Sequence, residues 1–481
     1  MLLAYILVPL IGAAIMPIVR KIWSKASTAI AIFVATYLVA VTSWIVYLEM
    51  VMKKSLSIDH WAFGGKLLLN IDGLSLVVLL AISLVALVTI GFSASYPIDS
   101  DRRPGYNALI LLAVAGMNGL VMAADVFSLY VFLEIVSISS FILITFQYDK
   151  EGIESSFKYM MLSAVATIFL LTGIAILFAA TGSLSFAELA ASLKSGGLAT
   201  QLGLALMVFA FAVKAGMMPF HAWLPDAYTA APAPVSILLA GIVTKVAGVY
   251  TLMRLVLAVF GFSKSFSLLL LLIGALSTIM GAFMALGQKD FKRMLAFSSI
   301  SQIGYMVMGF AIGTPLGLIG AVFHLFNHSV FKSLLFLNAG AVEMATGSRK
   351  FDDLGGLANR MPVTGVTSII GFLSTAGIPP LAGFWSKLII IIALWTAGYQ
   401  WFAAIAVFTS LVTLAYLLSL QRNVFFGKIK EGLENIKEVG PAFYWPAILM
   451  AVITIATGLF FPFIFQKLIL PVNSLLGLLA K

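Results

Sequence analysis

The sequence predicts an all-α polytopic membrane protein with about fourteen transmembrane helices. Hydrophobic residues make up 62% of the 481 residues, whereas charged residues make up only 10%. The mean hydropathy is +1.09. Soluble domains are typically about 25% charged. In addition, apolar runs of about 20 residues, the length of a spanning helix, recur along the whole chain.

The first apolar run, Met1–Val19, is followed directly by Arg20 and Lys21. It has no basic region ahead of it and no small-residue cleavage pattern, so we expect a retained helix rather than a signal peptide. Two later runs look interrupted by glycine and proline, and residues 428–438 are expected to form an amphipathic surface helix. The expected spans lie near residues 2–19, 28–50, 71–95, 107–124, 126–147, 155–180, 199–217, 234–258, 265–287, 294–312, 317–342, 361–395, 402–422 and 443–465.

The net charge of +10 comes from basic residues scattered among short loops. This pattern fits the lysine and arginine bias of cytoplasmic loops better than a nucleic-acid surface. The bias favours an arrangement with both termini outside a prokaryotic cell membrane. The basic residues that then lie inside are Arg20, Lys21, Lys25, Arg102, Arg103, Lys150, Lys289, Lys292, Arg293, Arg349, Lys350, Arg360, Arg422, Lys428, Lys430 and Lys437.

The chain contains no cysteine. It therefore offers no disulfide and no thiolate for an iron–sulfur cluster or a zinc-finger site. If electrons move in this system, they move in another subunit. We expect no catalytic residue, no cofactor and no metal site in this chain.

Four ionisable residues fall well inside expected spans: Glu134, Lys214, Lys245 and Lys387. A charge at the centre of a spanning helix costs about 2.5–3.5 kcal/mol on insertion scales. Each could be a structural ion pair, or could snorkel to an interface. Four such groups exceed what helix packing usually requires, so the pattern favours a path for protons or ions.

Glu134 and Lys214 could form a switchable pair. Burial in an apolar site disfavours an ammonium ion, and a nearby carboxylate stabilises it. Pairing would hold the lysine charged, and separation would let it release a proton. The sequence alone does not establish that the two side chains meet.

His324, His328 and Lys332 follow one another at four-residue spacing and share one helix face. Three interpretations compete for the two histidines. They could bind a metal, but no third ligand is evident. They could carry protons between charged sites, which suits the near-neutral pKa of histidine. They could also be ordinary core histidines.

The two interrupted runs contain "AGMMPFHAW" and "AGIPPLAGFW", which share Ala-Gly, a proline at matching spacing and a nearby tryptophan. The prolines between residues 219 and 234 remove backbone donors and stop a continuous helix. At membrane depth the freed carbonyls must be satisfied by protein or water. We therefore expect hydratable, protein-lined places beside Lys214 and Lys387. His221 and Asp226, in the first break, are either structural or line the pathway.

Three stretches together resemble one family: "KAGMMPFHAWLPDAYTAAPAPVSILLAGIVTKVAGVY", "FHLFNHSVFKSLLFLNAG" and "GIPPLAGFWSK". They are similar to the antiporter-like subunits shared by Mrp-type cation/proton antiporters, respiratory complex I and membrane-bound energy-converting hydrogenases. The likeness runs from about residue 70 to 420 and looks nearest to the Mrp D-type subunit. Some family members place a glutamate where Lys387 stands.

This resemblance implies two inverted five-helix repeats, each with one broken helix. The implied organisation is three N-terminal helices in residues 1–106, repeats in 107–260 and 261–425, and an amphipathic connector with the last helix in 426–481. It also implies proton translocation by Glu134, Lys214, Lys245 and Lys387, connecting histidines at positions 324 and 328, and less certain roles for Lys158 and Lys332.

We expect a proton-translocating subunit of a multisubunit complex, with other hydrophobic subunits and the lipid bilayer as partners. The sequence leaves open whether a sodium gradient or redox partner subunits, as in a hydrogenase or an oxidoreductase complex, drive it. It also leaves open whether sodium itself passes through this chain. The alternatives are a stand-alone transporter for a small solute, a quinone- or haem-binding subunit, and a purely structural scaffold.

Overall fold

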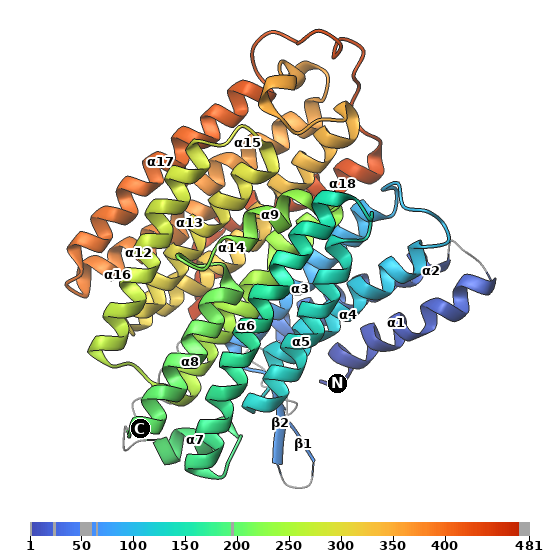
Figure 1. The fold of residues 1–481 in the computed structure, drawn as a ribbon. Coiled ribbons are helices and arrows are strands. Elements are labelled where there is room, and N and C mark those ends of the chain that lie inside the picture. The colour runs from blue at the N-terminus through green and yellow to red at the C-terminus, as the bar shows by residue number, and fades with distance from the viewer. Residues whose placement is uncertain (1, 23–25, 49–59, 64–65, 194–196, 471–481) are drawn as a thin grey trace.

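The computed structural model of the protein describes residues 2–22, 26–48, 60–63, 66–193 and 197–470. These residues form a bundle of long helices that run side by side (Figure 1). Twelve helices are long and apolar enough to cross a membrane, and three shorter apolar helices accompany them. Lys25 and residues 49–50 of the second expected span lie outside the described residues.

Most crossings are single helices. These are α1 (Ala4–Ile22), α2 (Ala26–Val46), α3 (Gly73–Ser93), α4 (Arg103–Met122), α5 (Val126–Ile144), α6 (Lys150–Thr181), α12 (Lys264–Leu286), α13 (Phe291–Ala311), α14 (Pro315–Thr346), α17 (Gln400–Val424) and α18 (Pro441–Leu459).

Three further crossings are composite. One joins α8 (Leu198–Ala215) to α9 (Trp223–Ala230), and another joins α15 (Pro362–Ala376) to α16 (Ala382–Thr396). The third runs from α10 (Ala233–Leu238) through α11 (Thr251–Leu255) and contains three π-helical stretches: η3 (Leu239–Val243), η4 (Lys245–Tyr250) and η5 (Val256–Phe260). The predicted fold of fourteen crossings with two broken helices is therefore confirmed.

The remaining elements are short. They are the antiparallel strands β1 (His60–Phe63) and β2 (Lys66–Asn70), helix α7 (Phe186–Ser192), the 3-10 turns η6 (Phe351–Asp353) and η7 (Leu357–Asn359), and α19 (Phe461–Ile464) with the π-helical η8 (Phe465–Ile469).

The prediction of a surface helix at residues 428–438 is wrong, because this segment forms turns. Gly432 has a φ of 85°, which ends any helix there. Lys430 instead extends its ammonium group to the backbone carbonyls of Phe351 and Asp352. These contacts fasten the segment to the loop that follows α14.

Two five-crossing repeats, α4 to η5 and α12 to α17, share their turns as well as their breaks. Helices α6 and α14 both end in Thr-Gly-Ser, at Thr181 and Thr346, with the glycine in the left-handed region. In each repeat the following residues form a β-bridge with the N-cap aspartate of the preceding helix, at Asp125 and Asp290. Because five is odd, the second repeat runs through the membrane in the opposite direction.

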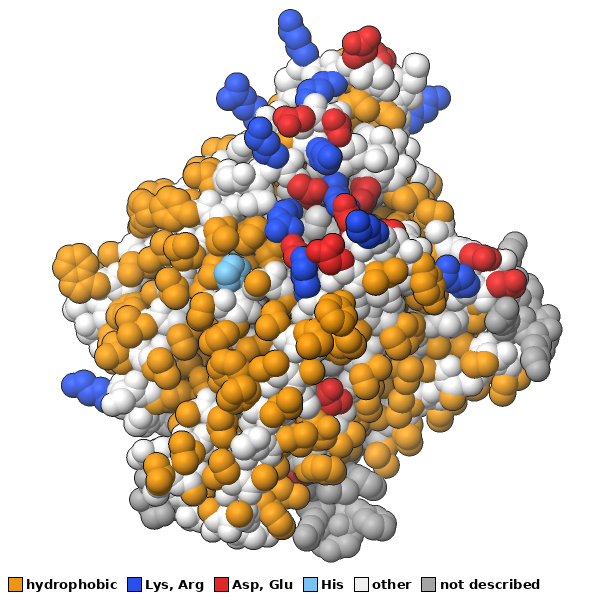
Figure 2. Space-filling model, viewed as in Figure 1, with side chains coloured by type: hydrophobic (Ala, Val, Ile, Leu, Met, Phe, Trp, Pro, Cys, Tyr) orange, Lys and Arg blue, Asp and Glu red, His pale blue; other side chains and the backbone are white. Residues whose placement is uncertain are grey.

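Helix α14 runs through the middle of the molecule and packs against α3, α10, α13, α15, α16 and α18. Its side chains are buried from Gly317 to Val342. Unlike the surface of a soluble protein, the visible outer face is covered mostly by hydrophobic side chains (Figure 2). Charged side chains gather at the upper end of that view (Figure 2). We call this end, which carries Asp149, Asp290 and Arg349, the charged face.

Candidate functional site

The first broken helix satisfies its freed backbone groups with protein atoms. Helix α8 stops at Gly216, whose φ of 66° is left-handed and whose N–H donates back into the last turn. The indole Nε1 of Trp223 donates to the carbonyl of Val213 at 2.9 Å. The backbone N–H of Met218 donates to Ser277 Oγ at 3.0 Å. Protein atoms therefore form hydrogen bonds with backbone groups at the break, as is required inside a membrane, where lipid offers no partners.

Lys214 lies in the last turn of α8, directly before this break, and its side chain is 1% exposed. Its Nζ is 3.5 Å from Glu134 Oε1, so the two side chains that the sequence suggested as a pair do meet. The same Nζ donates to Ser137 Oγ at 2.8 Å and to Ser163 Oγ at 2.5 Å. Thr167 Oγ1 donates to Glu134 Oε1 at 2.6 Å. One carboxylate and two hydroxyls thus surround the ammonium group.

The lysine of the second broken helix has different contacts from those of Lys214. Lys387, in α16, is buried, and its Nζ donates to the freed carbonyl of Thr375 at 2.8 Å. The ammonium also lies 4.8 Å from the centre of the Tyr305 ring, within cation–π range. Asn327 Nδ2 donates to the carbonyl of Ala382 at 3.0 Å, which ties α14 to the first turn of α16. Among the described residues, Lys387 has no carboxylate within ion-pair distance.

Two further lysines lie between the breaks, and both are fully buried. Lys245 begins the π-helical stretch η4, and its Nζ donates to the carbonyl of Ala240. Lys332, on α14, donates to Ser298 Oγ at 2.8 Å and to the carbonyl of Leu295 at 3.3 Å. π-Helical turns are rare and frequently mark functional sites, and nothing in the sequence predicted them here.

The two histidines of α14 are also fully buried, with ring centres 6.2 Å apart. His324 Nδ1 is 2.9 Å from Ser386 Oγ, and its Nε2 is 3.2 Å from Gln302 Oε1. Within the described part of the chain, neither ring nitrogen of His328 has a hydrogen-bond partner. His324 thus connects α14 to the second broken helix, because Ser386 directly precedes Lys387.

Three sequence candidates lie apart from this buried line. Lys158, which is 46% exposed, pairs with Asp226 at 3.0 Å, and Arg293 Nη1 approaches the same carboxylate at 2.7 Å. His221 is half-exposed, with Nδ1 3.3 Å from the carbonyl of Pro219. These side chains lie at the surface rather than between the lysines.

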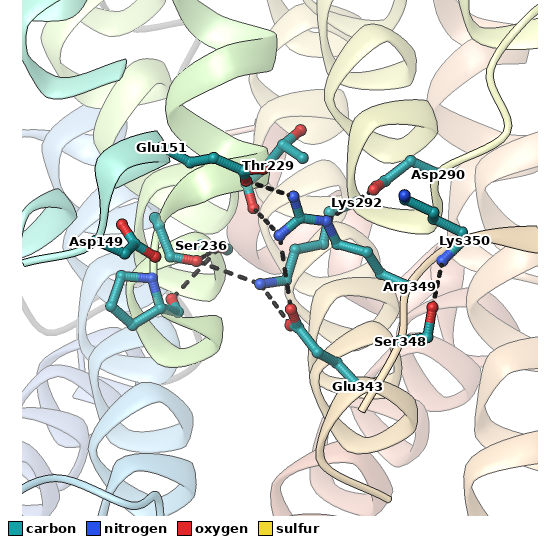
Figure 3. A network of polar contacts seen from close by, with 12 residues as sticks. Asp149, Glu151, Thr229, Ser236, Asp290, Lys292, Glu343, Ser348, Arg349 and Lys350 are labelled. Carbon is teal, nitrogen blue, oxygen red and sulfur yellow. Dashed lines mark hydrogen bonds and ion pairs between the residues drawn. The ribbon is translucent and has the colours of Figure 1, made fainter. Parts of the chain in front are cut away.

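A polar network that the sequence did not predict joins the two repeats at the charged face (Figure 3). Arg349 is 2.7 Å from both Glu151 on α6 and Asp290 before α13. Lys292, which is buried, lies 2.6 Å from Glu343 and 3.2 Å from the carbonyl of Ala231. Charged residues near helix ends are common, so their sequence positions alone gave no signal of this convergence.

The metal interpretation of the histidine pair gains no geometric support. Within the described ranges, no group of three or more histidine, cysteine, aspartate or glutamate side chains could hold a metal ion. The contacts of His324 are a hydroxyl and an amide. The structure thus places titratable side chains on α5, α8, η4, α14 and α16, and all of them except Glu134 on α5 are buried.

Comparisons with known proteins give the family. The family described as NADH:quinone oxidoreductase/Mrp antiporter, TM matches residues 123–413. The chain is 33% identical over 416 residues to the D subunit of the Na(+)/H(+) antiporter of Alkalihalophilus pseudofirmus, covering 85% of this chain and 84% of the relative. It is 37% identical over 380 residues to the N subunit of the NADH-quinone oxidoreductase of Desulforudis audaxviator, covering 76% and 74%.

The fold agrees with these relatives. One protein of the Mrp complex from a Dietzia species superimposes with a TM-score of 0.90 at 26% identity, covering 99% of this chain and 97% of that one. The match therefore includes both broken helices and the helices outside the matched family region. The chain belongs to the NADH:quinone oxidoreductase/Mrp antiporter transmembrane family.

Proposed function

We propose that this chain carries protons across the membrane along its buried titratable groups, as one subunit of a larger membrane complex. The observation that carries the proposal is Lys214, a buried ammonium group held by Glu134 and two serines at a helix break. Relatives named as sodium/proton antiporter and NADH-quinone oxidoreductase subunits support it. The proposed line is Glu134, Lys214, Lys245, Lys332, His328, His324 and Lys387.

Glu134 and Lys214 act as the switch of the line. While they are within 3.5 Å, the carboxylate stabilises the charged form of the lysine. A small separation leaves the ammonium in an apolar site, which favours release of a proton. Because Lys214 lies in the last turn of α8, two residues before Gly216, a separation of the pair would need only a local change at the end of that helix.

Transfer between the groups requires intermediate carriers. The two ring nitrogens of His328, the amide nitrogen of Gln302 and the hydroxyl of Ser333 are buried polar atoms without hydrogen-bond partners among the described residues. Such atoms are usually satisfied by ordered water. Water molecules beside α14 would therefore connect Lys245 and Lys332 to the histidines, and His324 would pass the proton through Ser386 towards Lys387.

The chemistry of this line favours protons over sodium. Sodium, a hard cation, prefers several oxygen ligands, as calcium and magnesium do. The line offers mostly nitrogen, and Glu134 is its one carboxylate among the described residues. We therefore place proton transfer in this chain and leave any sodium site to a neighbouring subunit.

The position of Glu134 also indicates which face of the chain a neighbouring protein covers. Its side chain is 24% exposed although it lies halfway along α5. Val131, Ile138 and Ile142 share this face of α5 and are exposed. Carboxylates at this depth normally face protein or water rather than lipid. A hydrophobic partner subunit over this face would complete the surroundings of Glu134.

We also propose the orientation and the division of the chain. The charged face carries most of the loop lysines and arginines, so it faces the cytoplasm of a prokaryotic cell and both termini lie outside. The functional halves are residues 107–260 and 261–425, with 1–106 and 426–481 as supporting segments.

Because the chain lacks cysteine, a single cysteine introduced by Ser192→Cys or by Lys350→Cys reports on one face of the membrane each. An impermeant maleimide should label only the first in intact spheroplasts, and labelling of only the second would reverse the orientation.

The central test removes single charges from the line. Lys214→Ala and Lys245→Ala should each lower proton-coupled transport by about 100-fold, the scale of a lost proton-transfer group. Lys437→Ala, at an exposed lysine of the charged face, is the matched control and should transport normally. Complex assembly is checked by co-purification. Wild-type transport in both buried-lysine variants would overturn the proposed line.

What drives the transport is decided by the partner subunits. The assembled complex should be purified in mild detergent and its proteins identified by mass spectrometry. Small hydrophobic antiporter subunits alone would indicate sodium/proton exchange, and an iron–sulfur or nickel–iron module would indicate redox driving. Recovery of the chain alone, with full activity in liposomes, would favour a stand-alone transporter instead.

A further inference from the structure

A cavity of about 500 Å³ opens at the charged face, between the ends of α12 and α17. Its basic lining residues are Lys289, Arg422, Lys428 and Lys430, and its acidic lining residue is Asp352. Four cations against one carboxylate leave a formal charge of +3. The proposed proton line uses none of these residues.

Three of these cations have no partner in the part of the chain that the structure describes. Lys430 is held by the carbonyls of Phe351 and Asp352. In contrast, the side chains of Lys289, Arg422 and Lys428 form no ion pair or hydrogen bond with described residues. Arg422, in the last turn of α17, is favoured there by the helix dipole. Lys289 and Lys428 are loop residues, and no helix end accounts for them.

The membrane-facing sides of the same two helices continue the cavity with an apolar surface. Leu286 and Phe426 line the cavity and are 44% and 48% exposed. Farther along the two helices, Phe283 and Phe408 lie with ring centres 6.2 Å apart. The exposed apolar side chains on this surface are Leu276, Met280 and Phe283 of α12, and Phe408, Leu411 and Leu418 of α17.

We propose that the cavity binds the phosphate headgroup of an anionic phospholipid, with the acyl chains lying along α12 and α17. Basic pockets between transmembrane helices suit anionic headgroups, and a guanidinium binds phosphate oxygens in a two-pronged geometry. The unpaired cations supply the recognition, and the apolar surface accommodates the chains. The headgroup would tie α12 and α17, the first and last helices of the second repeat, to the loop after α14.

The experiment uses the assembled complex, depleted of lipid and titrated with phosphatidylglycerol, phosphatidylcholine or inorganic phosphate, with bound lipid counted by native mass spectrometry. The test variant is Arg422→Gln with Lys428→Gln. Its control, Arg360→Gln with Lys437→Gln, removes one arginine and one lysine that are exposed elsewhere on the charged face. The test variant should lose one tightly bound phosphatidylglycerol and bind it about 30-fold more weakly, at about five-fold per cation. The control should bind like the wild type.

Three results would overturn the proposal. Equal weakening in both variants would mean a general surface charge effect. Equal retention of phosphatidylcholine would mean that the phosphate charge is not recognised. Competition by inorganic phosphate alone, at the same concentration, would mean a free-anion site. As a final arm, a photo-crosslinking residue in place of Phe426 should capture lipid, and capture of a neighbouring subunit instead would contradict a lipid-filled surface.

Discussion

The two broken helices share a backbone design but hold their lysines by different chemistry. In both, Ala-Gly ends the first half-helix with a left-handed glycine, and a tryptophan follows the break. Lys214 then meets a carboxylate and two hydroxyls, whereas Lys387 meets a backbone carbonyl and an aromatic ring. Lys214 can therefore gain or lose an ionic partner, whereas Lys387 has no ionic partner among the described residues.

The matching turns show where this difference comes from. Counting from the N-caps Asp125 and Asp290, the place of Glu134 in the first repeat is taken by Ser299 in the second. Counting back from the Thr-Gly-Ser turns, the places of Ser163 and Thr167 are taken by His328 and Lys332. The second repeat thus has basic side chains where the first has the hydroxyls that bind Glu134 and Lys214. The two repeats therefore share a backbone geometry but carry side chains of different charge at equivalent positions.

The largest effect should come from removing the carboxylate that distinguishes the two sites. Glu134→Gln should lower proton-coupled transport by about 100-fold, because Lys214 loses its charged partner. Ser299→Ala, at the corresponding place, should change transport by less than about two-fold, because the bond that Ser299 Oγ makes with described residues stays within its own helix, to the carbonyl of Leu295.

The same pair also allows a test of coupling. If Glu134 and Lys214 act as one unit, Glu134→Gln should have little further effect in a Lys214→Met background. Transport is measured as proton uptake in vesicles at equal amounts of assembled complex. Additive losses, or a large loss in Ser299→Ala, would show that the two sites do not differ as described.

Substitution of the glycines at the two breaks should affect the stability of the protein and its transport activity differently. At Gly216 an added Cβ would lie 2.4 Å from Leu224 Cδ1, whereas at Gly377 it would lie 3.1 Å from Cδ of Lys387. Gly216→Ala should therefore cost about 2–4 kcal/mol from its left-handed φ and the overlap with Leu224. Gly377→Ala should cost about 1–2 kcal/mol but displace the lysine and reduce transport.

Gly398→Ala is the matched control for both breaks, because its φ of 87° is also left-handed and its added Cβ would meet nothing within 4 Å. Thermal inactivation of the purified complex measures stability, and vesicle uptake measures transport. Normal transport by Gly377→Ala would mean that the position of Lys387 is not critical.

The smallest effect is expected at the surface pair. Lys158→Gln should change transport by less than about two-fold, since Lys158 is 46% exposed and lies outside the buried line. Aspartate and lysine side chains ordinarily change charge outside the range between about pH 6 and 9, so the contact between Lys158 and Asp226 does not depend on pH within this range. The activity ratio of variant to wild type should therefore stay constant between about pH 6 and 9. A ratio that changes across this range would place Lys158 in the proton pathway.

The sequence was sufficient for features that depend on length and backbone chemistry. Apolar run lengths predicted the crossings, and Gly-Pro patterns predicted both breaks, because proline removes a backbone donor and stops a continuous helix. The costly buried charges at Glu134, Lys214, Lys245 and Lys387 also stood out, since ionisable residues are rare in spans.

The sequence was insufficient where common residues gain their role from contact. Ser137 and Ser163 lie far from Lys214 in the chain, and serine occurs throughout the spans, so their hydrogen bonds to the ammonium could not be foreseen. The network around Arg349 likewise depends on how α6, α13 and α14 converge (Figure 3). The charge pattern at residues 428–438 suggested a helix, but Gly432 and the contacts of Lys430 decided otherwise.

The paired Thr-Gly-Ser turns bear on how the chain is threaded during synthesis. The two copies read TGSLSFAEL and TGSRKFDDL, and both bond the serine hydroxyl to a nearby acid, Glu188 or Asp353. Nearly the same turn must therefore form once in each compartment. The visible distinction is Arg349 and Lys350, which replace an uncharged pair in the first copy. With the charged face inside, as proposed above, these two cations would mark the second turn for the cytoplasmic side, which the shared fold of the turn alone does not do.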